Sequence, residues 1–166
     1  ALLGDGSFRD AHGILEKVLS MTADPTSPRL RGTLAITRAE VEGVTGAPKA
    51  EMVRDMLEAI VEKNMEKGLK AIQAASGANA EMKLFAKLIL ERLRFLFLLR
   101  LKAGMDEYIK SQISEDDFIF LRNLAAKAGK DLTSDTLLKF IDAYENSGRT
   151  SIPELALEIA LTDSSL

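Results

Sequence analysis

Apolar residues recur along most of this chain at intervals of three and four positions, which places them on one face of an α-helix. The pattern predicts helices over about residues 7–22, 38–44, 48–63, 65–75, 82–103, 105–113, 114–129, 133–148 and 153–163. No segment shows the sustained alternation of apolar and polar residues that is typical of a half-buried β-strand. We therefore predict an all-α fold, a multi-helix bundle of seven to nine helices.

The segment from Met82 to Lys102 is apolar around most of its circumference, and we expect the bundle to pack around it. Lys87, Glu91 and Arg94 form its only consistent polar stripe. Charged residues interrupt the segment too often for a membrane-spanning helix. The pattern thus predicts the central helix of a soluble bundle, ended by Gly104.

The composition is that of an ordinary globular protein, with 46% hydrophobic and 28% charged residues. The chain has no cysteine, which excludes disulfides and thiolate metal sites and suits a reducing cytoplasm. Its first ten residues lack the basic and apolar regions of a signal peptide. They read as the middle of a protein, so we expect the chain to be a fragment of a longer one.

The charge is unevenly distributed. The net charge of −3 argues against a dedicated nucleic-acid binder. Residues 82–105 carry six Lys or Arg and one Glu, whereas residues 106–166 carry six Lys or Arg and twelve Asp or Glu. These regions could attract each other within the chain or across a subunit interface, or they could simply form a solvated surface.

Candidate catalytic chemistry is scarce. The only histidine is His12, and the sequence contains no HExxH, GxSxG or GxxxxGK[ST] motif. The acidic run Glu115–Asp117 follows Ser114 and is better explained as a capped helix N-terminus than as a metal site. We predict no catalytic residue, no metal site and no enzymatic activity for this chain alone.

One compact constellation lies near the start, in the string GDGSFRDA from Gly4 to Ala11. Ser7 is a good N-cap, Asp10 stands at the capping-box position, and Arg9 falls in the first helical turn. Free N–H groups at a helix start, together with a guanidinium, suit a phosphate. On local features alone, a capping box with a solvated arginine is the more common explanation.

The string GSFRDAHGILEK resembles the sensor-2 motif of the AAA+ clamp-loader ATPases, and most closely that of the gamma/tau subunits of bacterial DNA polymerase III. Further segments resemble the same family in order: Ile36–Gly46, Met52–Ile72, Leu93–Lys102 and Leu157–Leu161. The resemblance therefore covers almost the whole chain. His12 and Gly13 depart from it, because the family usually has Leu and Ser there.

The resemblance implies two domains. Residues 1–46 would be the end of an AAA+ lid domain, and residues 47–166 a helical collar, or oligomerisation, domain. Arg9 would be the sensor-2 arginine that reaches ATP held by a preceding module, with Gly6 and Ser7 shaping the helix start and Asp10 supporting it. The fragment itself would bind no cofactor, whereas the parent protein would use ATP and Mg²⁺.

The function implied is subunit assembly in the bacterial cytoplasmic machine that uses ATP to load the sliding clamp on primed DNA during replication. The partners would be other clamp-loader subunits, in homo- and hetero-oligomers, with the clamp and DNA met only indirectly. No membrane contact and no strong nucleic-acid binding are expected of this chain. Some Phe and Leu surface of Met82–Lys102, or the charges of Arg92, Arg94 and Arg100 beside it, could then face a neighbouring subunit. The alternative is a free-standing helical scaffold for protein interactions, with no nucleotide role.

Overall fold

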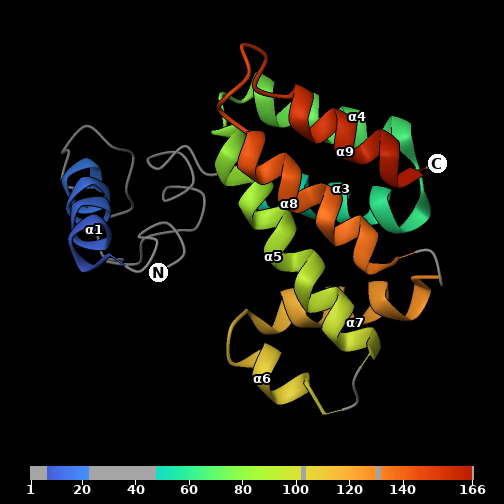
Figure 1. Ribbon diagram of the computed structural model, residues 1–166. Coiled ribbons are helices and arrows are strands. Elements are labelled where there is room, and N and C mark those ends of the chain that lie inside the picture. Colours follow the sequence, from blue (N-terminus) through green and yellow to red (C-terminus); the bar gives the residue numbers. More distant parts are fainter. Residues whose placement is uncertain (1–6, 23–47, 102–103, 130–131, 166) are drawn as a thin grey trace. The chain divides into compact units, whose positions relative to one another are not determined.

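The computed structural model describes residues 7–22, 48–101, 104–129 and 132–165. All regular secondary structure in these ranges is helical, which confirms the predicted all-α fold (Figure 1). The chain divides into two compact units, residues 1–49 and residues 50–166.

The first unit contributes one described helix, α1 (Phe8–Thr22), close to the predicted range of 7–22. Ser7 precedes the helix, and its carbonyl oxygen accepts a hydrogen bond from the backbone N–H of Ala11 at 3.1 Å. Phe8, Leu15 and Leu19 are exposed on α1. The helix predicted over residues 38–44 lies outside the described residues.

The second unit is a bundle whose helices follow the predicted order. They are α3 (Ala50–Glu62), α4 (Met65–Gly77), α5 (Met82–Leu101), α6 (Asp106–Lys110), α7 (Glu115–Lys127), α8 (Ser134–Asn146) and α9 (Leu155–Ser165). The largest difference is in the segment predicted over residues 105–113, which is helical only in the five residues of α6. The described ends of the other helices lie within about two residues of the predicted ones, as at α9, which begins two residues after the predicted start at Pro153.

Helix α5 is the centre of this bundle. It extends from the end of the unit that holds α4 and α9 toward the end that holds α6 and α7 (Figure 1). It packs against α3, α4, α7 and α8, and Phe85, Ile89, Leu93 and Leu96 are almost fully buried along it. Gly104, just beyond it, has a φ of +95°, the left-handed conformation expected of a glycine that ends a helix.

The structure corrects one expectation about α5. Among its described residues, no large apolar side chain is exposed, because the helices of the same chain cover it on several sides. Leu88, Phe97, Leu98 and Leu99 of α5 are half-buried, so its described residues leave no large exposed apolar patch. Among the described helices, none is both long and apolar enough to cross a membrane.

Side-chain caps begin two helices of the bundle. The Oδ1 atom of Asn64 accepts a hydrogen bond from the backbone N–H of Lys67 at 3.0 Å at the start of α4. The Oγ atom of Ser114 likewise accepts one from the backbone N–H of Asp117 at 3.3 Å at the start of α7. Both caps satisfy N–H groups that the first turn of a helix leaves without a partner, and the Ser114 cap confirms the sequence prediction.

Helices α4 and α9 approach closely at Gly68. A Cβ atom built on Gly68 would lie 2.5 and 2.8 Å from the two Cδ atoms of Leu161, a residue that is completely buried. These distances are shorter than carbon atoms tolerate, so a larger residue at this position would force Leu161 or the helices apart.

Replacing Gly68 with alanine should therefore lower the free energy of unfolding by about 1 to 2 kcal/mol, since the clash outweighs the gain in helix propensity. Gly77 is the matched control in the same helix, because nothing lies within 4 Å of a Cβ atom built there. Gly77→Ala should be neutral or stabilising by up to about 1 kcal/mol in urea denaturation. Equal stabilisation by both substitutions would mean that Leu161 moves aside without cost.

Candidate functional site

The predicted sensor-2 residues lie at the start of α1. Arg9 is exposed in the first turn of the helix, and Ser7 stands directly before it, half-buried. Asp10 belongs to α1, but its side chain lies outside what the structure describes, and Gly6 lies outside the described residues altogether. A role of these residues in contacting nucleotide stays a prediction.

Arg9 fits one part of a nucleotide site. An exposed guanidinium in the first turn of a 15-residue helix can reach a phosphate that approaches from solvent, and it offers a planar fork of N–H donors. The sequence contains no phosphate loop that would cradle the other phosphates. Arg9 could thus contribute one charged contact to a nucleotide that other residues hold.

The described residues form no other reactive cluster. No group of three or more His, Asp or Glu residues among them is arranged to hold a metal ion. His12 lies 3.6 Å from Glu16 one turn further along α1, with about 70% of both side chains exposed (71% and 70%). This pair is an exposed contact between neighbouring turns of one helix.

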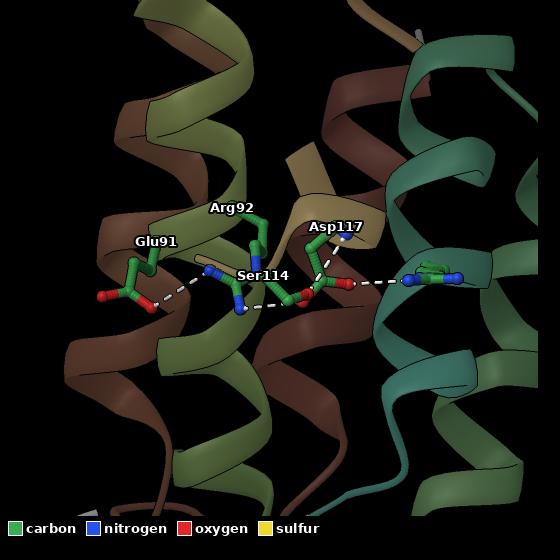
Figure 2. A network of polar contacts seen from close by, with 5 residues as sticks. Glu91, Arg92, Ser114 and Asp117 are labelled. Carbon is green, nitrogen blue, oxygen red and sulfur yellow. Dashed lines mark hydrogen bonds and ion pairs between the residues drawn. The ribbon is translucent and has the colours of Figure 1, made fainter. Parts of the chain in front are cut away.

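A network of charged side chains links three helices inside the second unit (Figure 2). Asp117 of α7 accepts a hydrogen bond from Nη2 of Arg54 on α3 at 2.7 Å. Its other carboxylate oxygen lies 3.6 Å from Nη2 of Arg92 on α5, and Arg92 in turn lies 3.8 Å from Glu91. Asp117 thereby ties α3, α5 and α7 together at one point.

The environment of Asp117 sets the charge state of its carboxyl group. Burial by itself raises its pKa, but the hydrogen bond from Arg54, the charge of Arg92 and the cap by Ser114 together outweigh burial. The pKa of Asp117 consequently lies below its ordinary value, and the group is ionised at neutral pH. The network also leaves Arg54 Nε, Glu91 Oε2 and Arg92 Nη1 buried without a hydrogen-bond partner among the described residues.

Sequence reasoning recognised only half of the role of Asp117. The sequence pattern correctly predicted that Asp117 lies at a helix start. It did not predict that the side chain is buried and in contact with two arginines. The available signal was helical spacing, because Asp117 stands four and seven positions before Leu121 and Leu124 on the buried face of α7. One ion pair, between Arg92 and Asp117, joins residues 82–105 to the acidic C-terminal region within the chain.

Exposed apolar side chains of the second unit gather on α8, α9 and the loop that joins them: Leu138, Ile141, Ile152, Leu155 and Ile159. Elsewhere in the described part of this unit, the large apolar side chains that are exposed are Met65, Tyr108 and Ile119. A groove of about 280 Å³ lies between α8 and α9, with Asp142 and Asn146 on its α8 wall and Leu155 and Ile159 on its α9 wall. Leu138 and Ile141 of α8 do not line this groove.

Comparison with known protein families matches the part of the chain that forms the helical bundle of the second unit. A family model described as DNA polymerase III subunits gamma and tau domain III matches residues 36–162. The match includes α3 to α8 and most of α9, and it leaves α1 outside. Among curated proteins, none matches the chain.

Proposed function

Because the chain belongs to the family of DNA polymerase III subunits gamma and tau, through their domain III, we propose that its second unit joins subunits of the clamp loader into one complex. That complex uses ATP to place the sliding clamp on primed DNA during replication. The partners are other clamp-loader subunits, including further copies of gamma or tau, in the cytoplasm of a bacterium.

The observation that carries this proposal is that α8 and α9 have exposed apolar side chains on a bundle that already has a buried core. One chain by itself forms a buried core, in which Phe85, Ile89, Leu93 and Leu96 of α5 are almost fully covered by neighbouring helices. The exposed Leu and Ile side chains on α8 and α9 are therefore not required to fill that core. A stable helical unit with an apolar outer surface suits assembly rather than catalysis.

We also propose a role for the first unit, which links ATP to the collar. Residues 1–46 form the end of an AAA+ lid domain in this view, and residues 47–166 form the collar. Arg9 contacts a phosphate of ATP, with Gly6 and Ser7 shaping the helix start and Asp10 supporting it. The nucleotide and Mg²⁺ are held by a separate nucleotide-binding module, so the 166-residue chain by itself binds no cofactor and hydrolyses no ATP.

Assembly is tested by mixing the 166-residue chain with the other clamp-loader subunits of the same bacterium. We expect the chain to enter their complex, as measured by size-exclusion chromatography with light scattering. In excess, it should also displace the full-length subunit and reduce ATP-dependent clamp loading, because it occupies the same position without a nucleotide-binding module.

The Arg9→Ala chain is the matched control in this experiment. It should assemble as the wild type does, since Arg9 lies in the first unit and assembly is assigned to the second. A wild-type chain that stays monomeric in the presence of all other loader subunits would overturn the proposed function.

A further inference from the structure

Two residues of α1 have no part in the function proposed above. His12 and Gly13 lie inside this 15-residue helix, at positions where the clamp-loader family usually has Leu and Ser. A glycine inside a helix lowers its stability, because the backbone of a glycine loses more conformational freedom on folding than that of any other residue. Such a glycine is useful where another group has to come close to the backbone.

The chain itself supplies no group of that kind at Gly13. Among the described residues, no atom lies within 4 Å of a Cβ atom built on Gly13. Gly68 of α4 is the opposite case, because the side chain of Leu161 fills the space beside it. The space at Gly13 is therefore open to a group from outside the described part of this chain.

Gly13 lies on the same face of α1 as Arg9. At ~100° per residue, the two positions are about 40° apart around the helix, and Gly13 is about 6 Å further along its axis. Ala11 and Ile14, which are half-buried, lie on the opposite side of the helix. The face with Arg9 and Gly13 thus points away from the side of α1 that is partly covered.

The exposed apolar side chains of α1 form a separate row. Phe8, Leu15 and Leu19 are 95%, 50% and 49% exposed, and their row lies about 100° from Arg9 around the helix. An apolar row of this kind suits contact with protein. Gly13 lies on the far side of Arg9 from this row, so a protein contact along the row does not explain the glycine.

The polar groups of the Arg9 face change character along the helix. The guanidinium of Arg9 stands at the helix start, and His12 and Glu16 follow, 3.6 Å apart and with 71% and 70% of their side chains exposed. A carboxylate repels phosphate but accepts hydrogen bonds from O–H and N–H groups, as a neutral imidazole also does. ATP has the matching order of groups, because its phosphates are followed by a ribose with hydroxyls and by a base with an amino group.

We propose that Gly13, with His12 and Glu16 beside it, contacts the nucleoside part of the ATP whose phosphate Arg9 contacts. Gly13 lets the nucleoside approach the backbone of α1, and His12 and Glu16 accept hydrogen bonds from its hydroxyl or amino groups. The inference rests on the proposed role of Arg9. It adds the residues of this chain that hold the part of ATP beyond the phosphates.

Gly13→Ala in the full-length subunit tests the close approach. Affinity for ATP and for tripolyphosphate, a phosphate chain without a nucleoside, is measured by competition with a fluorescent ATP analogue. Gly13→Ala should bind ATP at least about fivefold more weakly, because its methyl group occupies the space of the nucleoside, and should bind tripolyphosphate as the wild type does. Gly77→Ala is the matched control, since a Cβ atom at Gly77 also has no atom within 4 Å among the described residues, and it should bind both ligands normally.

The thermal stability of the nucleotide-free subunit gives a second measurement. The melting temperature of Gly13→Ala should equal or exceed that of the wild type, because alanine favours a helix more than glycine does. A lower melting temperature would show that protein packs against Gly13 in the full-length subunit, which would overturn the inference. His12→Leu, which restores the usual residue of the family, should weaken ATP binding about two- to tenfold and leave tripolyphosphate binding unchanged.

Two binding results would also overturn the inference: ATP affinity of Gly13→Ala equal to that of the wild type, or an equal loss for ATP and tripolyphosphate. Arg9→Ala separates this inference from the proposed function, because loss of a phosphate contact should weaken binding of both ligands. If Arg9→Ala has that effect while Gly13→Ala has none, the role of Arg9 stands and only the nucleoside contact fails. If Arg9→Ala binds both ligands as the wild type does, the proposed role of the first unit fails as well.

Discussion

Replacing Asp117 with alanine should lower the free energy of unfolding of the second unit by about 3 kcal/mol. The substitution leaves two guanidinium groups without the carboxylate that lies 2.7 Å from Arg54 and 3.6 Å from Arg92. The side chain of Arg92 is only 15% exposed, so water cannot replace the lost partner fully. Arg54 is 36% exposed and recovers part of its hydration, which keeps the cost near the lower end of the range for broken buried pairs.

Asp116 provides a matched control for this prediction. It precedes Asp117 in the first turn of α7 and is exposed. Both substitutions remove one negative charge from the N-terminal turn, an effect of about 0.3 to 1 kcal/mol, so the difference between them isolates the network. Urea denaturation measures both, and equal losses of stability would show that the contacts with Arg54 and Arg92 contribute nothing.

The contribution of Asp117 should also depend on pH in a defined direction. Burial raises the pKa of this carboxyl group, but Arg54, Arg92 and Ser114 together lower it by more than burial raises it. Its pKa is therefore lower in the folded chain than in the unfolded chain. Stability from such a group is complete above the unfolded pKa of about 3.9 and is lost as the pH falls through the folded pKa. The stability gap between the wild type and Asp117→Ala should stay constant from about pH 7 to about pH 5 and narrow below about pH 4. A gap that stays constant at still lower pH would contradict this assignment.

The helices were predictable from the sequence because their signals are local. Ser114 followed by three acidic residues marks the start of α7 through contacts within one turn, and Gly104 marks the end of the α5 segment through its own backbone conformation. The apolar circumference of residues 82–101 likewise required no knowledge of the neighbours to predict burial. Each of these features is determined within a few residues of the chain.

Other features depend on tertiary contacts and could not be predicted from local sequence patterns. Helical spacing assigns Asp117 rather than Asp116 to the buried face of α7, but only the fold brings Arg54 and Arg92 of other helices to its carboxylate. Gly68 is an ordinary residue of a helical pattern until Leu161 is placed against it.

The large exposed apolar patch expected on α5 is absent from its described residues for a related reason. A helix that is apolar on all sides requires cover, but its pattern does not distinguish cover by its own chain from cover by another. For α5 the cover comes from α3, α4, α7 and α8, and the uncovered apolar surface lies on α8 and α9 instead. The two-sided pattern of Leu155, Leu157, Ile159 and Leu161 in α9 was present in the sequence and indicates this surface.

Replacing Arg9 with alanine in the full-length subunit should reduce ATP-dependent clamp loading by about 10- to 100-fold. A hydrogen bond to a charged group is worth about 1.5 to 3 kcal/mol, and each 1.4 kcal/mol changes a rate or an equilibrium about tenfold. Thermal unfolding should be unchanged, because Arg9 is exposed in the first turn of α1. Loading is measured as the rate at which a labelled clamp appears on primed DNA after ATP is added.

Two further variants separate a contact with phosphate from a general effect of charge. Arg9→Lys retains the positive charge but loses the planar fork of donors, so it should load the clamp at an intermediate rate. Lys17→Ala removes an exposed cation from the same helix and should load as the wild type does. Unchanged loading by Arg9→Ala would refute the sensor-2 assignment, and an equal loss in Lys17→Ala would attribute the effect to the charge of α1 rather than to a contact at its start. If Arg9→Ala instead fails to enter the loader complex, Arg9 acts in assembly, because a residue that only senses nucleotide leaves the collar contacts intact.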